Sequence, residues 1–152
     1  MWMGYLVYLL TLLAALSCGL VGGALMAFSD FVMPALQRVA PEAAVPSMRG
    51  INAAARHSWF LKALGLAAAL SVALVVIALM RWHMPDSALL LLGAALYLLG
   101  TVLVSLVCNA PRNDQLARDA AQWPDYLAHW TRWNHVRAAS ALAASALFAM
   151  AM

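Results

Sequence analysis

Amide, imidazole and guanidinium side chains occur in three short stretches of an otherwise apolar sequence, and together they could perform acid–base or anion-stabilising chemistry. The stretches contribute Asn52, Arg56 and His57, then Asn109, Arg112 and Asn113, and finally His129, Trp130, Asn134, His135 and Arg137. Histidine accepts protons near neutral pH, while asparagine and arginine donate hydrogen bonds to developing negative charge. An unpaired buried amide costs about 1–3 kcal/mol, so the asparagines should bond to one another, to a ligand, or to both.

Helical spacing predicts that residues within each stretch share a face. Tyr126, Trp130, Asn134 and Arg137 follow one another at intervals of three or four residues, which places them on one stripe of a helix. Two further pairs are separated by one helical turn, namely Asn52 with Arg56 and Asn109 with Asn113.

Several kinds of site are absent from the sequence pattern. There is no His-x-x-x-His motif, no acidic residue inside an apolar span apart from Asp30 at the end of the first, no phosphate-binding loop and no Ser/His/Asp pattern. No metal and no cofactor is predicted, although spacing alone leaves open a haem held by two axial histidines such as His57 and His135. The nine Lys and Arg residues flank apolar spans and form no basic run, so membrane lipid, and not nucleic acid, is the expected partner.

The elements that must position these residues are membrane helices. The chain of 152 residues is 66% hydrophobic and only 10% charged, which is far from the composition of a soluble domain. We expect one all-α domain over residues 1–152, a bundle of four transmembrane helices at about 5–31, 59–80, 88–108 and 126–152. A short interfacial helix within residues 42–58 should lie along the membrane surface between the first two spans. Pro34 and Pro41 should mark where the chain leaves the bilayer after the first span, and the stretch 109–114 should form a polar break after the third.

The last helix brings polar residues to the edge of the hydrocarbon. Its charge-free part, residues 138–152, is too short to cross a bilayer, so a crossing helix must extend back to about Trp133. Asn134, His135 and Arg137 then lie at a depth where polar groups are costly unless they face the bundle or a partner.

The distribution of positive charge predicts the orientation in the membrane. Almost all Lys and Arg residues fall on the side of the first and third connections, and the opposite side has only Arg81. The positive-inside rule therefore places both connections in the cytoplasm and both termini on the non-cytoplasmic side, in what we expect to be a bacterial inner membrane.

Four segments in this order resemble the anthrone-oxygenase-like family of small four-span membrane proteins. They are FSDFVMPAL at 28–36, MRGIN at 48–52, NAPRN at 109–113 and WTRWNHVR at 130–137. The similarity extends over residues 19–146, and its most specific parts are Asn-x-Pro-x-Asn and Trp-x-x-x-Asn-x-x-Arg.

The resemblance implies a membrane oxygenase that needs no cofactor and oxidises a reduced polycyclic aromatic or quinol-like substrate with O2. A base removes a proton from the substrate, and the resulting enolate reacts with oxygen. The implied roles are His57 or His135 as the base, Arg137 as the anion stabiliser, and four amide donors: Asn52, Asn109, Asn113 and Asn134. Phe28, Arg56 and Trp130 would bind the small aromatic substrate.

Two other functions fit the same residues. The chain could hold a haem, a quinone or a lipid headgroup without catalysis of its own. It could also be a structural subunit of a membrane complex or a homo-oligomer, which would pack through the Ala- and Gly-rich faces of the second and fourth spans.

Overall fold

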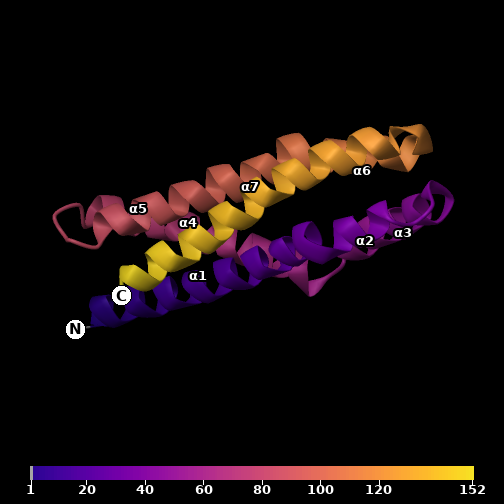
Figure 1. Ribbon diagram of the computed structural model, residues 1–152. Coiled ribbons are helices and arrows are strands. Elements are labelled where there is room, and N and C mark those ends of the chain that lie inside the picture. Colours follow the sequence, from indigo (N-terminus) through magenta and orange to yellow (C-terminus); the bar gives the residue numbers. More distant parts are fainter. Residues whose placement is uncertain (1) are drawn as a thin grey trace.

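Long helices run side by side along one axis in the computed structural model, which describes residues 2–152, with side chains from Gly4 onward (Figure 1). The elements in order are α1 (Trp2–Ala27), the π-helix η1 (Phe28–Val32), α2 (Met33–Gln37), α3 (Pro41–Ala55), α4 (Trp59–Met80), α5 (Ser87–Ala95), the π-helices η2 (Leu96–Leu103) and η3 (Ser105–Asn109), α6 (Ala110–Arg118), the 3-10 turn η4 (Ala120–Gln122) and α7 (Trp123–Met150). The expected all-α class is confirmed.

Three helical stretches of the described chain are long and apolar enough to cross a membrane. They are Gly4–Gln37, Trp59–Met80 and Ser87–Arg118. The helix α7 packs along α1 in the same bundle but is not among these candidates, and its amino-terminal half is polar, with Asp125, Arg132 and Arg137. The first three expected spans are therefore present as apolar helices.

Two of these helices continue where the sequence suggested breaks. The chain is helical through Pro34 and through the polar stretch around Pro111. Each proline follows a π-helical segment with one residue in between, Pro34 after η1 and Pro111 after η3. A proline lacks the backbone N–H and clashes with the carbonyl one turn earlier, and the wider π turn accommodates both defects. The expected exit at Pro34 and the expected break at 109–114 are therefore not helix ends.

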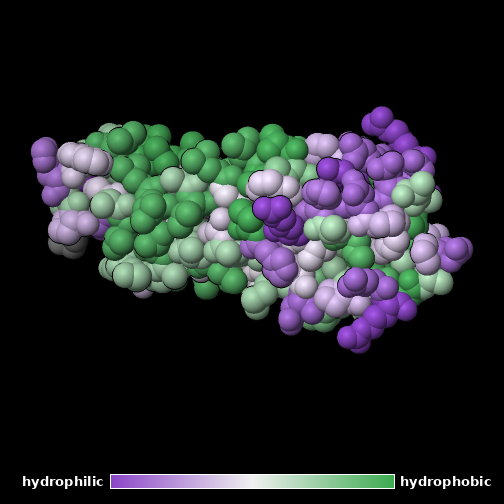
Figure 2. Space-filling model, turned by 45° about the horizontal axis from the view of Figure 1, so that its top comes forward, coloured by the Kyte–Doolittle hydropathy of each residue, from purple (hydrophilic) through white to green (hydrophobic). Residues whose placement is uncertain are grey.

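The continuation of these helices builds a polar headpiece, which we define as α2, α3, α6 and the first two turns of α7. Figure 2 shows hydrophobic surface over the bundle and hydrophilic surface over the headpiece, with a smaller hydrophilic patch at the opposite end of the molecule. The headpiece has its own core of Met33, Ala44, Val45, Met48, Leu116, Trp123, Tyr126 and Trp130.

The helix expected between the first two spans exists as α3, but its direction differs from the prediction. It runs back alongside α2, along the long axis of the molecule rather than across it (Figure 1). Its apolar face, with Val45 and Met48, packs into the headpiece core, so tertiary packing and not the membrane surface covers that face.

The chain enters α7 through a capped turn at Asp119. The Asp119 carboxylate accepts from the backbone N–H of Ala121 at 2.9 Å and from the Gln122 side chain at 3.3 Å. These two donors lower the pKa of the exposed Asp119 carboxyl below its usual value.

Small residues allow α1 and α7 to approach closely in the bundle. A Cβ atom on Gly22 would lie 3.0 Å from the backbone nitrogen of Leu142, and one on Gly19 would lie 3.0 Å from the Ser145 hydroxyl. Ser145 donates a hydrogen bond across the same contact to the carbonyl of Ala15, at 2.7 Å. The close contact between α1 and α7 therefore depends on small residues, as in other membrane bundles.

Aromatic residues lie at both ends of α4. Trp59 is 80% exposed at its start, with the Lys62 amine 4.1 Å from the ring centre, and Trp82 is 61% exposed just beyond its end. Tryptophan prefers the boundary between lipid headgroups and hydrocarbon, and 22 helical residues span about 33 Å, close to a bilayer core. The start of α4 therefore lies at one membrane boundary.

Candidate functional site

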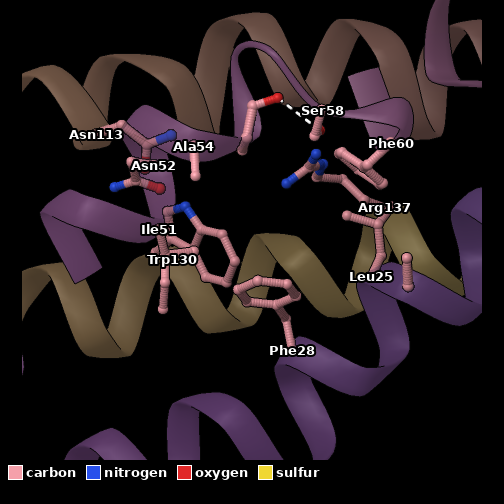
Figure 3. Close-up of a pocket in the computed structure, with 12 residues that line it drawn as sticks. Leu25, Phe28, Ile51, Asn52, Ala54, Ser58, Phe60, Asn113, Trp130 and Arg137 are labelled. Carbon is pink, nitrogen blue, oxygen red and sulfur yellow. Dashed lines mark hydrogen bonds between the residues drawn. The ribbon is translucent and has the colours of Figure 1, made fainter. Parts of the chain in front are cut away.

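A cavity of about 390 Å³ lies where the apolar bundle meets the headpiece (Figure 3). It is lined by α1, η1, α3, α6, α7 and the start of α4, through Ala24, Leu25, Phe28, Ile51, Asn52, Ala54, Ala55, Ser58, Phe60, Asn113, Trp130 and Arg137. We call it the main cavity. Because Ser58 and Phe60 flank the exposed Trp59, the main cavity is level with the start of α4. Its volume is within the range typical of small-molecule sites.

Arg137 is the only charged residue in the wall of the main cavity. Its side chain is 7% exposed, and its Nη1 donates to the Asn134 Oδ1 at 3.2 Å. Within the described part of the chain, no carboxylate lies within 4 Å of this guanidinium, and its buried Nε has no hydrogen-bond partner. A buried cation without a counter-ion is costly, so this arrangement favours an anionic or strongly polar ligand group beside it.

Asn134 fixes the position of Arg137 against the first helix. The Asn134 amide is fully buried, and its Nδ2 donates to the carbonyl of Leu25 at 2.7 Å and to the Ser29 hydroxyl at 2.8 Å. Leu25 lies just before η1, where the change from α to π geometry disturbs the usual pairing of carbonyls. Asn134 thus contacts the Leu25 carbonyl, the Ser29 hydroxyl and the Arg137 guanidinium, and its Oδ1 orients that guanidinium.

Aromatic rings form another wall of the main cavity. Trp130 lies 6.0 Å from Phe28 in a tilted arrangement and 6.0 Å from Tyr126 in a stacked one, measured between ring centres. The indole N–H of Trp130 is buried and has no hydrogen-bond partner. This wall therefore offers a flat apolar surface and an unused donor.

Two asparagines form the end of the main cavity opposite Arg137 (Figure 3). The hydroxyl of Tyr126 donates to the Asn113 Oδ1 at 2.8 Å and accepts from the Asn52 Nδ2 at 3.3 Å. The tyrosine therefore holds α3 and α6 together and leaves the second amide atom of each asparagine available.

Asn109 lies deeper, with 2% exposure. Its Nδ2 donates to the carbonyl of Trp130 at 3.1 Å, while its Oδ1 is buried without a partner.

Two smaller cavities adjoin the main one. A lateral cavity of about 250 Å³ shares Asn52, Ala55, Phe60, Asn113 and Arg137 with it and continues between α4 and η2–η3, past Leu61, Leu64, Val102, Ser105, Leu106, Asn109 and Ala110. A polar cavity of about 180 Å³ is lined by Arg49, Asn52, Arg56, Ala110, Asn113, Asp114 and Ala117. Asn52 and Asn113 line all three cavities.

The structure brings most of the predicted site residues together, but not the histidines. Asn52, Asn113, Phe28, Trp130 and Arg137 line the main cavity; Asn134 supports it, Asn109 lines the lateral cavity and Arg56 lines the lateral and polar ones.

His57 and His135 are exposed and line none of these cavities. His57 lies beyond the end of α3, and His135 is one position away from the buried stripe of α7, so its side chain points elsewhere around that helix. The predicted base role is therefore not supported by proximity for either histidine.

Tyr126 and Ser29 belong to the site although the sequence reasoning did not assign them roles there. The helical spacing placed Tyr126 on the stripe of α7 that builds the site, but it did not predict the hydrogen bonds to Asn52 and Asn113. Ser29 lies in the FSDFVMPAL segment, but no local pattern predicted its contact with Asn134, because the two residues are 105 positions apart in the chain.

The residues described contain no group of three or more His, Cys, Asp or Glu side chains placed to hold a metal ion. The main cavity is instead rich in hydrogen-bond donors with an apolar surround. Such a site suits a flat apolar molecule with an oxygen that carries negative charge.

Comparison with known proteins gives one match. No curated protein and no solved structure is similar to the chain. The sequence model of the family described as anthrone oxygenase matches residues 56–147, which is more than half of the chain and includes Asn109, Asn113, Trp130, Asn134 and Arg137. The chain therefore belongs to the anthrone oxygenase family.

Proposed function

We propose that this protein oxidises a reduced polycyclic aromatic substrate of the anthrone type with O2, at the membrane boundary and without a cofactor. The observation that carries the proposal is the buried guanidinium of Arg137, which lacks a carboxylate partner and faces an apolar cavity with aromatic walls. Membership in the anthrone oxygenase family supports the same reaction.

In the proposed binding mode, the fused rings lie along Trp130 and Phe28. The oxygen of the substrate points to Arg137. The Trp130 indole N–H and the Asn113 Nδ2 are further donors around the rings, and the Asn52 Oδ1 is an acceptor there. These donors bind the enolate more strongly than the neutral ketone, because their hydrogen bonds strengthen as negative charge grows on the oxygen.

The reaction balances with oxygen as the only co-substrate. The ring CH2 loses one proton, and the enolate carbon then transfers electrons to O2 and forms a C–O bond. Protonation gives a hydroperoxide, which loses its remaining carbon-bound hydrogen and the distal oxygen as water. One oxygen atom ends in the new carbonyl and the other in water, so the carbon supplies all the electrons that reduce O2.

The first proton leaves toward the polar cavity in this proposal. Arg137 increases the acidity of the bound substrate, so that water in the polar cavity, beside Asn52 and Asn113, accepts the proton. Neither His57 nor His135 has a part in this scheme.

The proposed placement in the membrane follows the charge distribution. The headpiece and the adjoining connections carry Arg38, Arg49, Arg56, Lys62, Arg112, Arg118 and Arg132, so the positive-inside rule places the headpiece in the cytoplasm. In this proposal α7 completes a four-helix membrane domain, and both termini are on the other side.

A second candidate is non-catalytic binding of a quinone or a lipid headgroup in the main cavity. The observation that favours it is that the lining of the main cavity contains no histidine and no carboxylate to act as a base. A haem-binding role would require an axial ligand such as histidine, cysteine, methionine or tyrosine, and a Soret band in the absorption spectrum of the purified protein would reveal it.

The decisive experiment measures oxygen consumption and quinone formation by the purified protein in detergent, with anthrone as the probe substrate. With ¹⁸O2, we expect one labelled atom in the quinone and one in water. Arg137→Gln should lower kcat/KM about 10²–10³-fold, as expected for loss of an anion-stabilising donor. Arg118→Gln is the matched control, since Arg118 is exposed and lines none of the three cavities.

Two results would contradict the proposal. If Arg137→Gln oxidises anthrone at the rate of the unaltered protein, Arg137 has no part in the reaction. Tight binding of anthraquinone by a protein that consumes no oxygen would establish the non-catalytic alternative.

A further inference from the structure

The lateral cavity offers a second route to Arg137, on the side away from the aromatic wall. It shares Phe60 and Arg137 with the main cavity, and it continues between α4 and the π-helical segments through Leu64, Val102 and Ser105. Figure 3 shows Phe60 and Arg137 at the end of the main cavity opposite Asn52 and Asn113. Arg137 is thus the charged group common to both spaces.

One side of the lateral cavity is lined by exposed leucines from two apolar helices. Leu61 and Leu106 line it and are 46% and 63% exposed, and they belong to two of the stretches apolar enough to cross a membrane. Exposed leucines on such helices contact lipid tails, so the lateral cavity is open to apolar solutes dissolved in the bilayer.

Size and lining distinguish the two cavities. The main cavity is about 390 Å³ and has Phe28, Trp130 and Phe60, whereas the lateral cavity is about 250 Å³ and has Phe60 as its single aromatic residue. The main cavity therefore suits fused rings, and the lateral one, whose lining also includes Arg56, Ser105 and Asn109, suits a smaller molecule.

We propose that the lateral cavity is the route by which O2 passes from the bilayer to the enolate bound in the main cavity. This inference rests on the proposed function. Uncharged, apolar O2 partitions favourably from water into hydrocarbon, so a membrane-facing entrance draws on a concentrated supply. With the rings against Trp130 and Phe28, oxygen reaches the carbon from the free side, and Arg137 stabilises the negative charge that O2 gains as it is reduced.

The test fills the lateral cavity without touching the main one. Val102→Phe and Ser105→Phe are two independent variants, because both residues line the lateral cavity and neither lines the main cavity. Val107→Phe is the matched control on the same helix, since Val107 is 60% exposed and lines none of the three cavities. Oxygen consumption is measured against O2 concentration and anthrone concentration, and anthraquinone binding is measured without oxygen by quenching of tryptophan fluorescence.

We expect both filling variants to lower kcat/KM for O2 roughly tenfold, while kcat/KM for anthrone at saturating O2 and anthraquinone affinity stay unchanged. Val107→Phe should match the unaltered protein in every measurement. Unchanged anthraquinone affinity also shows that the filling variants are folded.

Three outcomes would overturn the route, and they are distinguishable. If the unaltered protein is active and neither filling variant changes kcat/KM for O2, the route is wrong and the proposed function stands. If kcat/KM falls for anthrone and not for O2, the lateral cavity is the entrance of the aromatic substrate. If the unaltered protein binds anthraquinone but consumes no oxygen, the proposed function itself fails.

Discussion

Asn134→Asp is the substitution that examines the charge of Arg137 most directly. It changes one NH2 group to oxygen and keeps the side chain almost the same size. The Asn134 Oδ1 already lies 3.2 Å from the Arg137 Nη1, so the new carboxylate would form an ion pair with the guanidinium. The cation would then have an internal partner and would lose much of its attraction for the substrate enolate.

The size of this effect follows from the distance. Two unit charges 3.2 Å apart attract by about 5 kcal/mol at an effective dielectric constant near 20. Desolvation of the new carboxylate offsets part of this attraction. We therefore expect kcat/KM for anthrone oxidation to fall about 10²–10³-fold, which corresponds to roughly 3–4 kcal/mol.

The same substitution carries a stability cost that must be measured separately. The Nδ2 donor to the Leu25 carbonyl is lost, and the new oxygen would face that carbonyl where the nitrogen is now 2.7 Å away. Each lost or unpaired buried polar group costs about 1–3 kcal/mol. Circular dichroism and the thermal midpoint in detergent would show whether the variant is folded at the assay temperature.

A double-mutant cycle separates neutralisation of the Arg137 charge from a general loss of packing or stability. If Asn134→Asp acts by pairing with Arg137, the double variant Asn134→Asp/Arg137→Gln should be no slower than Arg137→Gln alone. Additive losses would refute the reasoning, and so would full activity in a folded Asn134→Asp variant.

Three further predictions address the packing, the amide end of the site and the histidines. Gly22→Ala should lower stability by about 1–3 kcal/mol in detergent unfolding, because its Cβ would lie 3.0 Å from the backbone of α7, whereas Gly23→Ala, with open space around it, should not. Tyr126→Phe removes the hydroxyl that joins α3 to α6, and we expect roughly a thirtyfold drop in kcat/KM with retained folding, because two bonds of about 1 kcal/mol each are lost. His57→Gln and His135→Gln should leave kcat/KM within about twofold, because both residues are exposed and outside the cavities; a loss of about 10²-fold or more in either would restore its role as the base.

Local periodicity was sufficient to predict the face of α7 that builds the site. Tyr126, Trp130, Asn134 and Arg137 are all buried, as their spacing indicated, because a regular helix repeats every 3.6 residues whatever it packs against. The same periodicity argues against His135, which is adjacent to Asn134 and therefore about 100° away around the helix.

The headpiece could not be predicted in this way. Prolines and polar residues at 34 and 109–114 are usual signs of a helix end, and recognising that they continue a helix requires knowledge of the π turns before them. Those turns depend on long-range contacts, such as the bond from Asn134 to Leu25, which no local pattern contains.

The π-helical segments η2 and η3 determine how the site responds when the chain gains or loses one residue nearby. A π turn arises when one residue is inserted into an α-helix, and losing that residue returns the helix to α geometry. Because the wider turn absorbs the extra residue, removing one residue between Leu96 and Ser105 would leave Asn109 and Asn113 facing Trp130 and Tyr126. A one-residue deletion in the regular α-helix that follows would instead rotate the residues beyond it by about 100°, so a change in chain length is tolerated by the site only within the π-helical segments.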